Sequence, residues 1–152
     1  MNKNILLLFV IVLSACDQRS QNNVSTVTEN VSKNSINDRW YTQADLDLGA
    51  TIYQEHCLQC HNKNAAGISD WMTTLDDGNY PPPPLNGTAH AWHHDIGTLT
   101  RTIKRGGVPL GGVMPGFENK LSDAEIRAVI AYFQSFWSDD IYSSWLEIGG
   151  LD

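Results

Sequence analysis

Hydrophobic residues along the chain fall into four patterned segments separated by polar stretches. The first is a continuous apolar run over residues 5–13. In the other three, residues 44–56, 98–105 and 126–133, apolar side chains recur at the spacing of one face of an α-helix. The pattern therefore predicts helices in these three segments.

Two of these helices carry end signals. Ser122 and Glu125 have the S-x-x-E spacing of a capping box, in which each side chain satisfies a free backbone N–H of the other residue. The middle helix, from Thr98 to Arg105, is followed by two glycines, which are typical of a C-cap. The last helix should therefore start at Ser122.

The apolar run near the start follows one cation, Lys3, and is too short for a membrane span of about 20 residues. It fits the hydrophobic region of a secretory signal. The next residues, Leu13-Ser14-Ala15-Cys16, resemble the lipobox of bacterial lipoproteins. This resemblance implies removal of a signal peptide, residues 1–15, acylation of Cys16 and attachment to the periplasmic or outer face of a bacterial membrane. Asp17 favours inner-membrane retention, and an ordinary secretory signal or an uncleaved anchor are the alternatives.

Residues 16–39 are dominated by Ser, Thr, Asn and Gln and contain no sustained apolar face. Such a stretch buries too little surface to offset the entropy of ordering it, so we expect a disordered, lipid-anchored tether. The folded domain is expected over residues 40–145, with a C-terminal tail over residues 146–152.

Composition and charge limit the function further. A chain of 152 residues provides one domain, and its net charge of −7 gives no basic surface for nucleic acid. From Trp40 onward there are 6 Lys and Arg residues against 14 Asp and Glu. This excess favours a partner with a basic docking surface, unless the basic cluster of Arg101, Lys104 and Arg105 borders the functional site.

The three cysteines serve at least two purposes, because Cys16 is remote from Cys57 and Cys60. Cys57-Leu58-Gln59-Cys60-His61 is a C-x-x-C-H sequence, the attachment signature of c-type haem. A Cys-x-x-Cys pair also occurs in redox dithiols and zinc sites. Zinc would need a second ligand pair, however, and a thioredoxin-like site a preceding strand, where this chain is helical in pattern.

Three further segments resemble class I cytochrome c and come in that family's order. Gly49, Tyr53 and Cys57, at intervals of four, match the first helix, and residues 129–133 match the last one. Between them lie Pro83-Pro84-Leu85-Asn86-Gly87, similar to the P-x-L-x-G element, and Met114-Pro115-Gly116-Phe117, similar to the M-P-x-F loop. The resemblance implies an all-α, cytochrome c-like fold with three to five helices around one covalently bound haem c.

The resemblance also implies individual roles. Cys57 and Cys60 would form the haem thioethers, and His61 and Met114 would be the axial ligands of the iron. The carbonyl of Pro83 would accept a hydrogen bond from Nδ1 of His61.

For other residues between these motifs the expected roles are less specific. Trp92 and Arg101 are expected as propionate contacts. His90, His93 and His94, with Asp95, offer a second site for copper or zinc as an alternative to surface histidines.

The segment from His61 to Pro83 is longer than usual in the family. We expect its extra residues, including Trp71 and Met72, to fold over one edge of the haem.

The expected function is a membrane-anchored monohaem cytochrome that carries single electrons between exported redox partners, such as a terminal oxidase or reductase. It would not be an enzyme, because His61 and Met114 fill both axial positions. The alternatives are a haem enzyme whose Met114 dissociates and a copper-handling protein that uses His90, His93 and His94.

Overall fold

The computed structural model describes residues 38–152. Within that range the chain is all-α, as predicted, and forms no strand. Its five α-helices are α1 (Gln43–His56), α2 (Leu58–His61), α3 (Ile96–Arg105), α4 (Asp123–Gln134) and α5 (Asp139–Glu147). Three short 3₁₀ helices are η1 (Lys63–Ala65), η2 (His90–His93) and η3 (Val108–Leu110).

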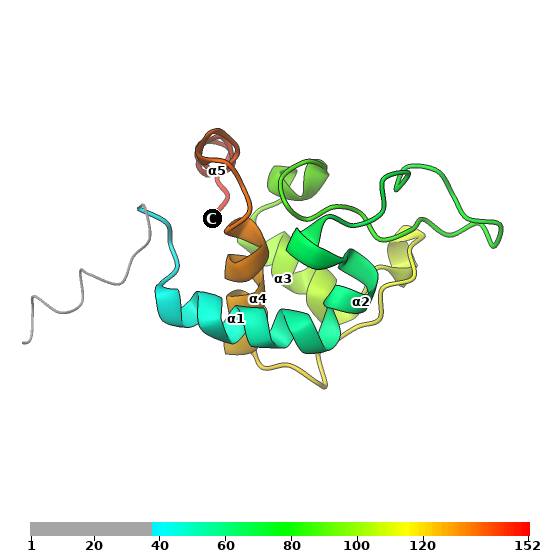
Figure 1. Ribbon diagram of the computed structural model, residues 1–152, viewed down its shortest axis with the longest axis horizontal. Coiled ribbons are helices and arrows are strands. Elements are labelled where there is room, and N and C mark those ends of the chain that lie inside the picture. Colours follow the sequence, from blue (N-terminus) through cyan, green and yellow to red (C-terminus); the bar gives the residue numbers. More distant parts are fainter. Residues whose placement is uncertain (1–37) are drawn as a thin grey trace, which may run out of the picture. The chain divides into compact units, whose positions relative to one another are not determined.

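The helices α1 and α4 cross in close contact at the centre of the domain (Figure 1). Gly49 is the point of closest approach, because a Cβ atom there would overlap the carbonyl of Ala128 and lie 2.8 Å from Cβ of Tyr132. Tyr53, one turn later, packs on Tyr132 with ring centroids 5.1 Å apart. A glycine therefore sets the spacing of the two longest helices.

The buried face of α1 is narrower than predicted. Ile52 and Tyr53 are buried, but Leu48, which we expected on the same stripe, is 41% exposed. Gly49 lies where α4 passes, so the adjacent position 48 is turned away from the crossing.

Side chains cap each of the longer helices. The predicted capping box of Ser122 and Glu125 is present at the start of α4, and a second one, formed by Thr42 and Asp45, starts α1. The middle helix begins two residues earlier than predicted, because Asp95 accepts a hydrogen bond from the backbone N–H of Thr98.

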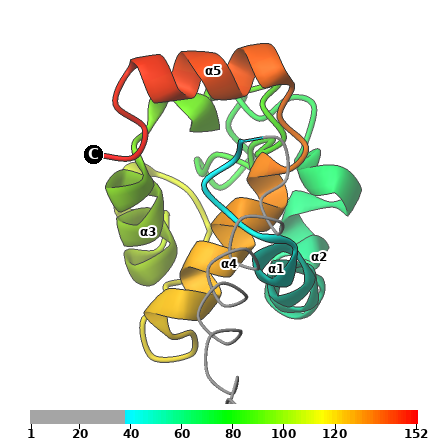
Figure 2. The same ribbon diagram turned by 90° about the vertical axis from the view of Figure 1, so that its left-hand side faces the viewer.

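The C-terminal segment packs on the domain through α5, which lies across one end of α4 (Figure 2). Tyr142 and Trp145 of α5 are buried, and the backbone N–H of Ile96 donates to the carbonyl of Gly150. Packing thus continues into residues 146–152, which we expected to form a tail.

The first described residues are held by α4 and α5. The guanidinium of Arg39, whose side chain is only 7% exposed, lies 4.0 Å from the ring centre of Tyr142 and donates to the carboxylate of Asp139 at 2.6 Å. The indole N–H of Trp40 donates to Oε1 of Gln134 at 2.7 Å. Arg39 therefore belongs to the folded domain, one residue before the expected boundary.

No helix within residues 38–152 is both long enough and apolar enough to cross a membrane. The expected signal peptide, Cys16 and most of the expected tether lie outside the described residues.

We predict that Gly49→Ala destabilises the domain by about 2 kcal/mol, because the added methyl group forces α1 and α4 apart. Chemical unfolding followed by circular dichroism measures this change. The matched control is Gln54→Ala, an exposed position on the same helix, which should change stability little. Equal unfolding midpoints for the two variants would contradict the role of Gly49.

Candidate functional site

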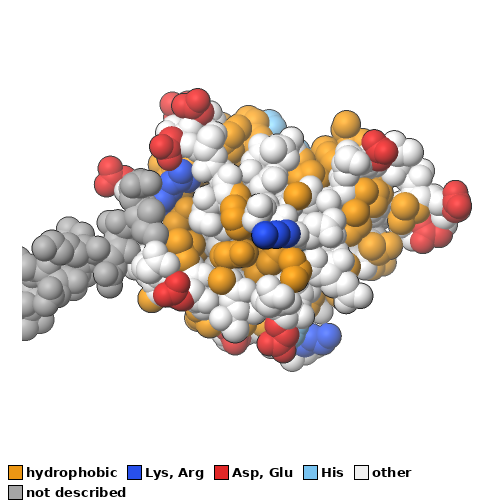
Figure 3. Space-filling model, viewed as in Figure 1, with side chains coloured by type: hydrophobic (Ala, Val, Ile, Leu, Met, Phe, Trp, Pro, Cys, Tyr) orange, Lys and Arg blue, Asp and Glu red, His pale blue; other side chains and the backbone are white. Residues whose placement is uncertain are grey.

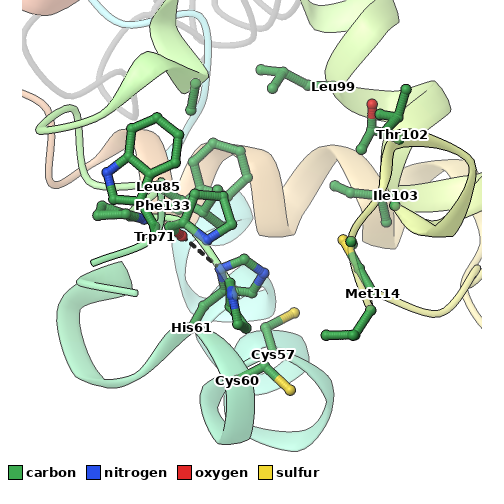
Figure 4. Close-up of a pocket in the computed structure, with 18 of the residues that line it drawn as sticks. Cys57, Cys60, His61, Trp71, Leu85, Leu99, Thr102, Ile103, Met114 and Phe133 are labelled. Atoms are coloured by element: carbon green, nitrogen blue, oxygen red, sulfur yellow. Dashed lines mark hydrogen bonds between the residues drawn. The ribbon is translucent and has the colours of Figure 1, made fainter. Parts of the chain in front are cut away.

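A cavity of about 570 Å³ lies beside the crossing of α1 and α4. Its walls come from α1, α2, α3, α4 and the two long loops between α2 and α4 (Figure 4). Most lining residues are apolar, among them Leu99, Ile103, Phe117, Val129 and Phe133. None of the described residues that line it is Asp, Glu, Lys or Arg. The cavity therefore suits a large, mostly apolar group rather than a free ion.

Cys57 and Cys60 line one end of the cavity, where the end of α1 passes into α2. Both thiols are free, and both side chains reach the same space (Figure 4). Burial, with a smaller contribution from Cys60, raises the pKa of the Cys57 thiol to about 11. A redox dithiol needs a lowered thiol pKa, so this environment disfavours that alternative.

His61 is buried at the end of α2, and its imidazole reaches into the cavity. Its Nδ1–H donates to the carbonyl of Pro83 at 3.0 Å. Burial lowers the pKa of His61, and the hydrogen bond to Pro83 opposes this effect only in part. The ring is therefore neutral near pH 7, which leaves the lone pair on Nε2 free to bind a metal.

The backbone around Pro83 is held by the turn that follows α2. The N–H of Ile68 donates to the carbonyl of Pro82 at 2.9 Å, and the N–H of Leu85 donates to the carbonyl of Ala65 at 2.8 Å. Gly67, with φ of +58°, touches Pro83 and Pro84 so closely that a side chain would not fit. These contacts place the carbonyl that orients His61.

Met114 reaches the cavity from the loop after α3, on the opposite side from His61 (Figure 4). This loop folds back on the end of α3: the N–H of Gly107 donates to the carbonyl of Met114 at 2.9 Å, and that of Phe117 to the carbonyl of Ile103 at 3.0 Å. Gly106 has φ of +82° and lies against the carbonyl of Met114, so the turn requires a glycine.

The long segment between His61 and Pro83 borders the same cavity. Trp71, Met72 and Tyr80 line it, in agreement with the expectation that this segment covers one edge of the site. A single β-bridge between Tyr80 and Gly112 joins this loop to the loop that carries Met114.

Neither residue expected to contact propionates lines the cavity. His90 and Ala91 of the 3₁₀ helix η2 line the cavity, as does His94 directly after it. Trp92 points elsewhere and stacks on His93, with ring centroids 3.8 Å apart.

Arg101 likewise lies on a different face of α3 from the residues that line the cavity. The cavity face of this helix carries Leu99, Thr102 and Ile103, whereas Arg101 is exposed and donates to Oγ1 of Thr98 at 2.8 Å. The basic cluster of α3 thus does not border the site, and Lys104 pairs with Asp123 at 2.5 Å.

The histidine segment does not converge on a metal site. His93 stacks on Trp92, while His90 packs on Trp71 with ring centroids 4.9 Å apart. Asp95 is engaged as the cap of α3. Among the side chains of residues 38–152, no group of three His, Cys, Asp or Glu is placed to hold a metal ion.

Comparison with known proteins identifies the family. Residues 44–133 match the family model described as cytochrome C oxidase, cbb3-type, subunit III. The chain belongs to this cytochrome c family. The match begins in α1 and ends in α4, so it includes the C-x-x-C-H sequence and Met114 but not α5.

Curated relatives include two cbb3-type cytochrome c oxidase subunits called CcoP. The protein from Azospirillum brasilense is 34% identical over 98 residues, which cover 64% of this chain and 30% of that protein. The protein from Rhodobacter capsulatus is 35% identical over 95 residues, 57% of this chain and 28% of the relative. The cytochrome c subunit of a quinone alcohol dehydrogenase from Gluconobacter oxydans (strain 621H) is 27% identical over 101 residues, 62% of this chain and 19% of that protein.

The chain spans less than a third of the length of these relatives. No solved structure was found that matches it.

The cofactor of this family is covalently bound haem c, and the residues of the cavity fit it. Two thiols, a neutral imidazole and a thioether enter one apolar space, a donor set that matches the vinyl groups and iron of one haem. The domain therefore holds one haem c.

Several cavity residues were not identified from the sequence. Tyr80, Leu110 and Val113 line the cavity from loops whose course depends on the bridge between Tyr80 and Gly112. No periodic pattern predicts such positions, because Tyr80 and Val113 lie outside helices and Leu110 ends the three-residue 3₁₀ helix η3. His56 also lines the cavity, and its position next to Cys57 was the signal that could have identified it.

Proposed function

We propose that this chain is an exported class I cytochrome c that carries single electrons between redox proteins. Cys57 and Cys60 would hold the haem through thioethers, and His61 and Met114 would bind its iron from opposite sides. The observation that carries the proposal is the convergence of these four side chains on one apolar cavity. When bound, the haem supplies a centre that alternates between Fe(II) and Fe(III).

The chain's own residues would favour electron transfer over catalysis. The Pro83 carbonyl fixes the ring of His61, and the loop contacts at Gly106 and Gly107 fix Met114. With both ligands positioned, no coordination site remains for a substrate. A thioether opposite an imidazole also gives a higher reduction potential than two imidazoles. The protein would therefore not be an enzyme.

The cavity opens to solvent through an exposed apolar rim. We define this rim as Met72, Tyr80, Leu110 and Val113, which line the cavity and are themselves exposed, together with neighbouring Val108. Met72 and Leu110 are more than 70% exposed. Apolar side chains gather over the loops that extend to the right of Figure 1, with acidic side chains at their outer end (Figure 3). An exposed patch of this kind is typical of a protein interaction site.

The charges near the rim indicate the charge of the partner's docking surface. From residue 64 to residue 100 the sequence contains no Lys or Arg. The loop between His61 and Pro83, which contributes Met72 and Tyr80 to the rim, also carries the exposed residues Asp70, Asp76 and Asp77. The rim would therefore dock on a redox protein with an apolar patch ringed by basic residues. Relatives named as subunits of a cytochrome c oxidase and of a quinone alcohol dehydrogenase support a respiratory complex, such as a terminal oxidase or reductase, as this partner.

We further propose that a lipid on Cys16 attaches the protein to the outer or periplasmic face of a bacterial membrane. Support comes from the lipobox-like sequence Leu13-Ser14-Ala15-Cys16 after an apolar run. Residues 1–15 would be the signal peptide, and the polar chain that follows would tether the cytochrome domain. Asp17 would favour the inner membrane.

We predict that Met114→Ala abolishes the long-wavelength absorption band that methionine ligation gives to oxidised haem c, and that the variant binds cyanide. Met72→Ala is the control, because Met72 also lines the cavity but is largely exposed. It should keep the band. Cyanide binding by the unmodified protein would instead support the alternative of an enzyme with a displaceable Met114.

We predict that the double variant Asp76→Lys, Asp77→Lys slows reduction of hexaammineruthenium(III), a cation, and speeds reduction of ferricyanide, an anion. Steering by nearby charges makes a change of about tenfold reasonable at low salt, and added salt should remove it. Stopped-flow absorption of the haem measures both rates.

The matched control is Asp140→Lys, Glu147→Lys, the same charge change on exposed positions of α5. It should alter the ratio of the two rates much less. Equal effects of the two double variants would show that electrons do not leave through the rim.

We predict that Cys16→Ser moves the full-length protein from the membrane fraction to the soluble periplasm of a Gram-negative host. Mass spectrometry of the unmodified protein should find a diacylglyceryl group on Cys16, and Ser20→Ala should stay in the membrane fraction. Membrane-bound Cys16→Ser protein would point to an uncleaved anchor, and an unmodified Cys16 to an ordinary secretory signal.

A further inference from the structure

The outer part of the loop that carries Met114 is not held in place by burial. All three residues of η3 are exposed, and three of the six residues from Gly107 to Gly112 are glycines. Hydrogen bonds at Gly107 anchor the base of this loop: its N–H donates to the carbonyl of Met114 at 2.9 Å, and its carbonyl accepts from the N–H of Gly112 at 3.0 Å. Because glycine loses more backbone freedom on folding than other residues, the outer part needs a further contact to keep one conformation.

A contact of this kind comes from the other long loop. The backbone N–H of Tyr80 donates to the carbonyl of Gly111 at 2.8 Å, beside the β-bridge that pairs Tyr80 with Gly112. The ring of Tyr80 also lies against Gly111, where an added Cβ atom would be 3.6 Å from Cδ2 of the ring. Met114 is three residues after Gly111, so this contact is on the same short segment as the proposed iron ligand.

The segment that supplies this N–H is itself held by hydrogen bonds. Near the tip of its loop the N–H of Leu75 donates to the carbonyl of Asn79 at 2.8 Å, and at its base the N–H of Ile68 donates to the carbonyl of Pro82 at 2.9 Å. Four consecutive prolines follow Tyr80, and each has a fixed φ angle. Tyr80 can therefore restrain the glycine-rich loop rather than move with it.

We propose that Tyr80 is a positioning residue for Met114: the hydrogen bond from its backbone N–H to Gly111 holds the outer loop so that the thioether stays on the haem iron. This inference rests on the proposed haem ligation and adds to it a residue that does not touch the iron. When the bond to Tyr80 opens, the loop before Met114 is free to move, and the backbone of Met114 is held mainly by its bond to Gly107. Met114 then leaves the iron more readily.

Opening of this bond has a defined effect on the redox centre. A thioether is a soft ligand that stabilises Fe(II) more than Fe(III), which is why methionine ligation raises the reduction potential. Loss of Met114 from the iron is therefore easier in the oxidised protein, and the potential falls as opening becomes easier. The long-wavelength absorption band of methionine ligation disappears in the same event. Both properties report the iron ligand rather than the overall fold.

The test is the Tyr80→Pro variant in its haem-loaded form, which lacks this N–H in a chain that already continues with prolines. Loss of one hydrogen bond should make dissociation of Met114 about fivefold more favourable. Guanidinium unfolding of the oxidised protein is followed by the long-wavelength band and by helical circular dichroism. We expect the band to be lost at a lower denaturant concentration than in the unmodified protein, while the loss of helix changes little. We also expect a lower reduction potential.

Two controls separate the hydrogen bond from other effects of the substitution. Tyr80→Phe keeps both the N–H and the ring, and Asp76→Pro places a proline at the second position of the turn from Leu75 to Gly78, where proline is favoured. Both should keep the band midpoint of the unmodified protein. An unchanged band midpoint in Tyr80→Pro, or equal shifts of its band and helix midpoints, would overturn the inference and leave the ligation by Met114 intact.

A second measurement decides if Tyr80→Pro does not retain haem. Coupling between two sites is reciprocal, so loss of the iron ligand should also weaken the hydrogen bond of Tyr80. Amide hydrogen exchange at Tyr80, measured by NMR, should be about fivefold faster in Met114→Ala than in the unmodified protein, and exchange at Ile68 should be unchanged. Equal exchange at Tyr80 in the two proteins would overturn the inference. Absence of the long-wavelength band from the unmodified protein would overturn the proposed ligation together with it.

Discussion

The contact between α1 and α4 at Gly49 is the constraint on which the rest of the domain depends. It lets the two backbones touch, and Tyr53 and Tyr132 extend the same contact. Because α1 ends at His56, this contact also determines where Cys57 starts the next turn, while the adjacent face of α4 presents Val129 and Phe133 as a cavity wall. One close crossing therefore sets the spacing between Cys57 and the apolar surface of α4 that lines the same cavity.

The two loops have a different role from the helices. They contain only short 3₁₀ helices, and each places one group at the cavity: the first places the carbonyl of Pro83 and the second places the side chain of Met114. Contacts outside the cavity hold both loops in place: the first loop packs on the turn at Gly67, and the second is hydrogen-bonded to the end of α3. The helices thus form much of the apolar cavity wall, and α2 carries His61, whereas the loops place Pro83, Met114 and the exposed rim.

Much of this arrangement could be predicted from the sequence, because it depends on local signals. The helical periodicity, the capping box at Ser122 and the C-x-x-C-H sequence each depend only on residues that are close together in the sequence. The differences have long-range causes. Leu48 fits the stripe of α1, but the contact of α4 at Gly49 leaves it exposed. Trp92 and Arg101 are close in sequence to cavity residues, yet neither lines the cavity. The two loops that form the rim are joined by a β-bridge between residues 80 and 112, and no local sequence pattern predicts this bridge.

The contacts of Arg39 and Trp40 have a mechanical consequence. These residues are bound to Asp139, Tyr142 and Gln134, on α5 and the end of α4, and none of the five lines the cavity. Tension applied to the chain from its N-terminal side would act first on these contacts and would be transmitted through them to α4 and α5. These contacts are also linked to the loop that orients His61, because Arg39 donates to the carbonyl of Trp137 and the indole N–H of Trp137 donates to the carbonyl of Leu85. Tension on the chain would therefore reach the segment beside Pro83 through these two hydrogen bonds.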